Sequence, residues 1–308
     1  NSGGLAGLGV VCSSGKARGV TGSGAPIGDP FDIDYVAHEM GHQFNMNHTQ
    51  NNSCNRNGGT AVEPGSASSI MGYAGICAPN VQSNSDDYFH GISLEECDAL
   101  ITSGGHTCPV ITPLSNSEPT LTGLSTSITI PANTPFALTA AANDPDPSDV
   151  LTYCWEQMDN QTGFTMPPSS ASTGGPMFRS LDPSTSPTRY FPNLQDLIAG
   201  NVSDWEVLPS VSRSMDFRVT VRDNASGGGC NDHDDLVVDV DGNSGPFLVL
   251  NPNNSGISWD ASTVQNITWD VANTSSSPVS CGSVDILLSL DGGQTFSAIA
   301  SNVPNDGN

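Results

Sequence analysis

Three of the chain's six histidines and one glutamate lie close together, as His38, Glu39, His42 and His48. Histidines four residues apart share one face of a helix, so both imidazoles can reach a single metal ion. His48 can supply a third ligand if the chain turns sharply after that helix, which leaves one coordination position open. The pattern predicts a catalytic zinc site, with Glu39 as the general base that takes a proton from water. The alternative is a helix that carries surface histidines by accident.

Two helices are needed to place these residues. The first should run from about Tyr35 to Phe44, with Asp34 as its N-cap. Asn45 follows it, and asparagine is, after glycine, the residue most tolerant of the left-handed conformation that ends helices. The turn toward His48 is therefore expected at Asn45. A second, short helix is predicted over residues 93–102, because Ser93 and Glu96 have the spacing of a capping box.

The segment from His38 to His48 resembles the metzincin zinc-peptidase signature, with Asn45 standing where the family has glycine. Ser69-Ile70-Met71-Gly72-Tyr73 resembles the Met-turn that follows it, which implies that Met71 forms a hydrophobic floor below the metal. In astacins and serralysins the corresponding tyrosine ligates zinc or stabilises the oxyanion, so the resemblance gives Tyr73 that role. The alternative for Tyr73 is a place in the core of a buried turn.

Taken with Glu63–Ser66 and Asp86–His90, the chain is most similar to bacterial reprolysin-like metallopeptidases, which are secreted multidomain proteins. The resemblance implies a zinc endopeptidase acting on protein or peptide substrates, with Gly3–Val11 as the cleft-edge strand that an extended substrate pairs with. Catalytic domains of this kind have several strands and two long helices before that strand. Residues 1–112 are therefore expected to be the C-terminal portion of such a domain, completed by a missing N-terminal segment of the same protein.

The charge and the cysteines restrict the other classes of function. A formal net charge of -24 makes binding to nucleic acid unfavourable, and no apolar run approaches the ~20 residues needed to insert into a membrane. Eight cysteines scattered through Gly/Asn-rich sequence favour disulfides, and hence a secreted or cell-surface protein, over free cysteines in a cytosolic one. The preferred pairs, each within one module, are Cys97 with Cys108 and Cys154 with Cys230. Cys12, Cys54 and Cys77 of the first module then remain, and an odd number cannot all pair within that module.

Beyond a Pro-bearing linker over 113–118, the pattern changes to short alternating strands. Residues 119–243 are predicted to form an immunoglobulin/cadherin-like β-sandwich, and residues 244–308 a second, truncated one. The fold class is thus an α+β metzincin catalytic domain followed by two antiparallel β-sandwich modules. The strands expected are 127–130, 136–140, 151–156, 215–221, 236–240, 247–250, 266–271 and 284–290.

The acidic loop with Asp144, Asp146 and Asp149 resembles the D-x-D loops of cadherin-like domains. Several carboxylates in one short loop can bind calcium, and a solvated acidic turn is the alternative. For the whole chain, the rival to a protease is an extracellular adhesion or structural protein whose metzincin domain is inactive or incidental. The zinc-ligand and general-base residues are all present, which argues against that rival.

Overall fold

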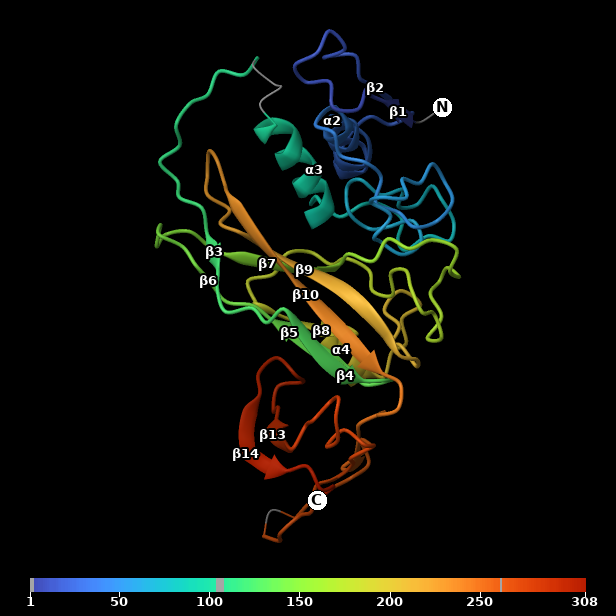
Figure 1. Cartoon of the computed structure of the whole chain (residues 1–308), viewed down its shortest axis with the longest axis vertical. Coiled ribbons are helices and arrows are strands. Elements are labelled where there is room, and N and C mark those ends of the chain that lie inside the picture. Colours follow the sequence, from blue (N-terminus) through green and yellow to red (C-terminus); the bar gives the residue numbers. More distant parts are fainter. Residues whose placement is uncertain (1–2, 104–107, 261) are drawn as a thin grey trace.

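The computed structural model describes residues 3–103, 108–260 and 262–308. Its first region, blue to teal in Figure 1, holds β1 (Gly3–Leu5), β2 (Val20–Gly22), α1 (Asp29–Phe31), the π-helix η1 (Asp32–Ala37), α2 (His38–Gln43) and α3 (Gly91–Thr102). β1 and β2 pair antiparallel. Between α2 and α3 the chain forms turns and irregular segments, with an isolated bridge between Gln50 and Glu63. No helix in the described ranges is long and apolar enough to cross a membrane.

The helix expected over 35–44 is present, but it starts earlier and its first part is a π-helix. Asp34 is not its N-cap. It lies inside η1, where its carboxylate accepts hydrogen bonds from the Ser85 backbone N–H and the Asn84 amide, both at 2.7 Å. Asn45 has the expected left-handed conformation, with φ 74°. The helix therefore ends where the sequence predicted, and the chain reverses there.

The helix α3 begins at Gly91, two residues before the expected start. Its N-cap is His90, whose Nδ1 accepts a hydrogen bond from the Ile92 N–H at 3.1 Å. The predicted capping box is wrong because Ser93 is buried within the first turn. Glu96 instead reaches across to Asn47, whose backbone and side-chain N–H groups donate to it at 2.7 and 2.6 Å.

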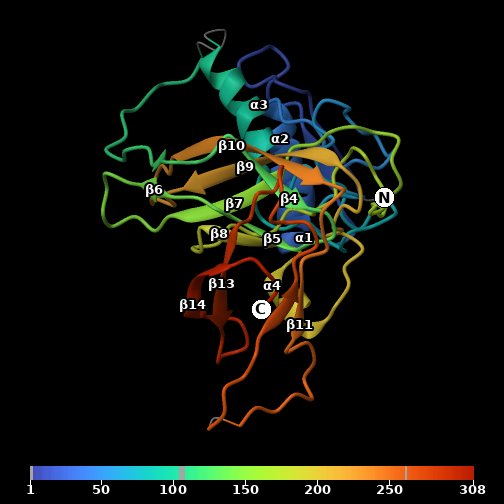
Figure 2. The same cartoon turned by 60° about the horizontal axis from the view of Figure 1, so that its bottom comes forward.

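The central region contains β3 (Thr120–Leu121), β4 (Ser127–Pro131), β5 (Phe136–Thr139), β6 (Ala142–Asn143), β7 (Thr152–Gln157), β8 (Thr188–Phe191), α4 (Leu194–Ala199), β9 (Arg213–Arg222) and β10 (Asn231–Asp241). Four strands form a sheet in the order β4-β10-β9-β7, and β5 pairs with β8 on the side away from α3 (Figure 2). The core between these layers is aromatic. Its largest buried side chains include Phe136, Trp155, Phe178, Phe191 and Phe217.

The expected strands of this region are confirmed, but the sheet is not purely antiparallel. β4 runs parallel to β10, with Ile128 opposite Val238 and Ile130 opposite Val240. About a hundred residues separate these strands in sequence, so no tight hairpin forces them to run in opposite directions. The parallel register places Ile130 and Val240 together in the core.

The three strands expected after residue 244 are also confirmed, as β11 (Leu248–Asn251), β12 (Thr268–Asp270) and β13 (Ser283–Leu288). A fourth strand, β14 (Ser297–Pro304), was not predicted. They form two separate antiparallel ladders, β11–β12 and β13–β14, rather than the sheets of a sandwich in the part described. Trp269 is buried, and its indole N–H donates to Asn305 at 2.8 Å. Many other apolar side chains here are exposed, including Leu248, Val249, Leu287 and Leu288.

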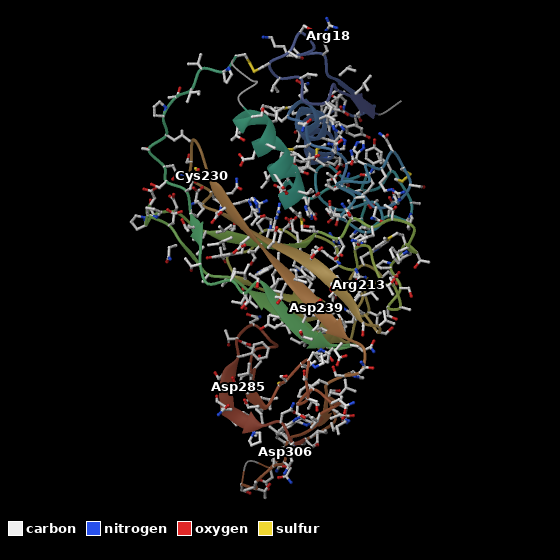
Figure 3. All side chains as sticks on the ribbon, in the orientation of Figure 1. Arg18, Arg213, Cys230, Asp239, Asp285 and Asp306 are labelled. Atoms are coloured by element: carbon white, nitrogen blue, oxygen red, sulfur yellow. A yellow bond between two sulfur atoms is a disulfide. The ribbon has the colours of Figure 1, made fainter. Side chains whose placement is uncertain are left out.

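Both predicted disulfides are wrong. Cys108 is bonded to Cys12, and the second bridge joins Cys54 to Cys77. Cys97 is free, because it lies on α3 and faces an apolar hollow lined by residues such as Met40, Phe44 and Phe89. Cys154 and Cys230 cannot meet because the whole of β9 lies between β7 and β10. Cys230 lies in the turn at one end of the β9–β10 ladder, whereas Arg213 and Asp239 lie near the other end (Figure 3).

Candidate metal centre

The three histidines converge on one point. His38 and His42 project from α2, and the reversal at Asn45 returns His48 to the same side. The Nε2 atoms of His42 and His48 are 3.1 Å apart, and one ring nitrogen of each imidazole lies within 4.8 Å of the other two. This is the spacing that three ligands of one metal ion require, since zinc–nitrogen bonds are about 2.0–2.1 Å long.

Each imidazole is fixed through its other nitrogen by a backbone carbonyl. The Nδ1 atoms of His38, His42 and His48 lie 2.7, 2.8 and 2.8 Å from the carbonyl oxygens of Ile70, Met46 and Asn55. A carbonyl oxygen only accepts hydrogen bonds, so Nδ1 must carry the proton in all three rings. Each Nε2 is then left with its lone pair free to bind a metal, and the ring orientations are set before any ion arrives.

Burial keeps these imidazoles neutral, which is the state that binds metals. Burial, followed by repulsion from protonated His42, lowers the pKa of His38 to about 3. Burial lowers the pKa of His48 to about 4, against a smaller opposing effect of its hydrogen bond to Asn55. The pKa of His42 is also lowered, again chiefly by burial. At neutral pH no proton competes with a cation for this site.

Glu39 lies beside the histidines on α2 and is 8% exposed. Burial raises the pKa of its carboxyl. Its Oε2 is buried and has no hydrogen-bond partner among the described residues, so this carboxylate has an acceptor that no described group satisfies. The carboxylate fits only because β1 passes over it at a glycine: a Cβ on Gly4 would lie 2.6 Å from Glu39 Cγ, and closer still to the carboxylate.

Met71 is fully buried and forms a small apolar cluster with Met46 and Ile70 below the histidines. It packs against α2 at Gly41, where an added Cβ would lie 2.5 Å from the methionine sulfur. The turn also carries the Ile70 carbonyl that orients His38. Met71 thus packs against the helix that carries two of the histidines, and its role as the floor of a metal site stays a prediction.

Tyr73 lies beside the third histidine, with its ring centroid 4.5 Å from that of His48. Its hydroxyl accepts a hydrogen bond from the Asn55 side chain at 3.1 Å. Asn55 therefore holds two members of the site, since its carbonyl also orients His48. Sequence reasoning missed both Asn55 and Gly4. A left-handed φ of 48° at Asn55 and the tight approach at Gly4 depend on contacts between distant segments, which no local pattern reports.

These groups line a cleft of about 740 Å³. β1 forms one rim, and its residues Gly3–Leu5 are exposed along the edge that does not pair with β2. The opposite side is formed by the segments at 72–76 and 83–85. Among the described residues that line it, Asp34, Glu39 and Arg56 are the charged ones.

The acidic group of the central region differs from the expected one. The structure brings Asp144 and Asp149 together with Asp223, their carboxylate oxygens lying within 4.8 Å of one another. Asp146 is turned away, and its carboxylate accepts the backbone N–H of Ser117 at 2.7 Å. Sequence reasoning missed Asp223 because it follows β9, far from the acidic loop in sequence. Calcium at this group stays a prediction.

Residues 1–100 match the family described as metallo-peptidase family M12B, reprolysin-like. The match supports a reprolysin-like metallopeptidase domain in this part of the chain. No curated protein matches significantly. One solved structure, described as a nucleoside hydrolase-related hypothetical protein from Saccharophagus degradans that is associated with carbohydrate metabolism, is 17% identical with a TM-score of 0.26. That similarity covers 49% of this chain and 30% of the other, and a TM-score this low does not establish a shared fold.

Proposed function

We propose that the chain is a secreted zinc endopeptidase, with His38, His42 and His48 as the metal ligands. The observation that carries the proposal is the convergence of three Nε2 atoms whose Nδ1 partners are all backbone carbonyls. Three neutral imidazoles and an open side suit a catalytic zinc ion better than a hard cation such as calcium, which prefers oxygen ligands. The two disulfides of the first region are consistent with an extracellular protein.

A bound zinc ion supplies Lewis acidity toward the scissile carbonyl and toward water. Glu39 takes the proton of the attacking water, since it lines the cleft beside the histidines and its carboxylate is not satisfied by a described group. The same carboxyl then gives that proton to the amine as the carbon–nitrogen bond breaks, and its raised pKa suits both transfers. The products are a carboxylate and an amine, so the proton balance closes without another acid.

Two further groups can contact the substrate. The exposed edge of β1 can pair with an extended peptide, whose carbonyl is thereby directed over the histidines. The Tyr73 hydroxyl, fixed by Asn55, can donate a hydrogen bond to the oxyanion that forms there. Arg56 is the cation that lines the cleft. The substrate class is therefore a peptide in extended conformation.

The test is casein hydrolysis and zinc content measured on the same preparations. Glu39→Gln should retain stoichiometric zinc and lose about 10²–10⁴-fold in rate, because the base is not a ligand. His48→Ala should lose the metal. Glu118→Gln and His233→Ala are the matched controls, since both side chains are exposed and neither makes a side-chain hydrogen bond or ion pair in the described structure. A wild-type protein that binds zinc without hydrolysing any peptide would favour the adhesion or structural alternative instead.

A further inference from the structure

The outer face of the central sheet is buried, although the alternating pattern of β9 predicts a strand exposed on one side. Asp216 is exposed as expected, but Arg218 and Thr220, on the same face, are 6% and 1% exposed. Glu156 of β7, opposite Arg218, is fully buried. The first region covers this face, with α3 on the side of the sheet opposite β5 and β8 (Figure 2). The sequence pattern failed here because a second layer packs on the sheet.

The contact is polar and is centred on the carboxylate of Glu156. Its Oε2 accepts the N–H of Gly91 at 2.8 Å, and its Oε1 accepts the hydroxyl of Ser180 at 2.6 Å and lies 3.5 Å from His90 Nε2. A fully buried carboxylate is costly unless its oxygens are satisfied. Two of its three partners belong to the first region, so neither region satisfies this group alone.

Hydrogen bonds lead from Glu156 to a metal-site histidine. The Ser180 hydroxyl, which donates to Glu156, accepts the hydroxyl of Tyr88 at 2.6 Å. The Tyr88 carbonyl accepts the N–H of Ile70 at 3.1 Å, and the Ile70 carbonyl is 2.7 Å from His38 Nδ1. Tyr88 is thus held at both ends, by the central region through its side chain and by the Met-turn through its backbone.

The segment after His48 is held by the central region as well. The side chain of Asn51 donates to the Gln161 carbonyl at 3.2 Å, and the side chain of Asn160 donates to the Gly59 carbonyl at 2.9 Å. Gly65 lies against the Trp205 ring, which an added Cβ would approach to 2.6 Å. The Met-turn and the segment after His48 are therefore both attached to the central region.

We infer that the central β region is a structural part of the metal centre, in which Ser180 and Tyr88 are positioning residues for His38. The inference rests on the proposed function and goes beyond it, because it makes the zinc affinity depend on residues outside the region that carries the metal site. Partners of metal ligands are commonly worth 10–100-fold in metal affinity. Ser180 acts through two further groups, so a smaller effect is expected.

The experiment measures zinc affinity by chelator competition in the full chain, together with the hydrogen-exchange rate of the Ile70 amide. Ser180→Ala and Tyr88→Phe should each weaken zinc binding by about three- to tenfold. Exchange at Ile70 should become faster in both. The matched controls are Ser127→Ala, an exposed position on β4, and Tyr190→Phe on β8, whose hydroxyls make no hydrogen bond in the described structure. These controls should leave both quantities at the wild-type value.

Two outcomes are distinguishable. A lower melting temperature with unchanged zinc affinity and unchanged exchange at Ile70 would overturn the inference, because the two hydroxyls would then serve stability alone. That result would leave the proposed function intact. A wild-type chain that binds no zinc would instead overturn the proposed function. Tyr88→Phe removes a single oxygen and keeps the ring, so it also guards against a variant that simply fails to fold.

Discussion

The first region and the central region are stabilised in different ways. The central region buries a continuous cluster of large apolar side chains, among them four phenylalanines whose ring centroids lie 4.9–6.2 Å apart. The apolar cluster of the first region is formed by only three buried side chains, those of Met46, Ile70 and Met71. Its other buried residues are largely polar or small, and they include Thr49, Gln50, Asn51 and Asn52.

Buried polar contacts, rather than a large apolar core, keep the site in place. Polar side chains that are buried and hydrogen-bonded fix the loops in one arrangement, but each bond contributes only about 0.5–1.5 kcal/mol net. Glu63 is an example: its buried carboxylate accepts the N–H groups of Ser68 and Ser69 at 3.0 and 3.1 Å and so shapes the Met-turn. The small apolar cluster of the first region therefore needs additional sources of stability. The two disulfides and the central sheet supply additional stabilisation, and we expect a bound metal to add to it.

The largest effect is expected in the central core. Phe217→Ala removes a fully buried ring that contacts three other phenylalanines, and such truncations cost about 3–5 kcal/mol of unfolding free energy. Urea denaturation measures this loss of unfolding free energy. The control is Val264→Ala, whose side chain is 95% exposed and whose stability should stay within about 0.5 kcal/mol of wild type. If the first region depends on the sheet, zinc should be lost in the same transition. Zinc retained after the sheet has unfolded would show that the first region does not depend on the sheet.

A smaller effect is expected from removing the metal, and it should be confined to one region. At a hundredfold excess over Kd, zinc stabilises the folded state by about 2.7 kcal/mol. Chelation should therefore speed hydrogen exchange of residues 38–73, where the three proposed ligand histidines and Met71 lie. Exchange in β9 and β10 should change little, because the aromatic core stabilises those strands independently of the ion. Equal loss of protection in both regions would show that they unfold as one unit.

The sequence predicted the groups whose position follows from local geometry. The i, i+4 histidines and the left-handed Asn45 depend on one helix and its end, and the strands of the central region follow from alternation. What it could not predict depends on contacts between distant segments. The pairing of Cys12 with Cys108, the parallel β4 and the buried outer face of β9 are all of this kind. Asp34 shows the same limit, because a tertiary contact with Ser85 outweighed its capping preference.

The smallest effect concerns the fit of β1 over Glu39, the proposed general base. Gly4→Ala places a methyl group where the Glu39 side chain now lies, so the carboxylate or the strand must move. A displaced catalytic group lowers the rate without removing a ligand, and a shift of this size is expected to cost about tenfold in kcat, or about 1.4 kcal/mol. Gly3→Ala is the matched control on the same strand, because an added Cβ there meets nothing within 4 Å. Zinc content should equal that of wild type in both variants, since the three histidines are untouched. Equal kcat for the two variants would show that β1 shifts to accommodate the methyl group. The first region would then be less rigidly fixed than its hydrogen bonds imply.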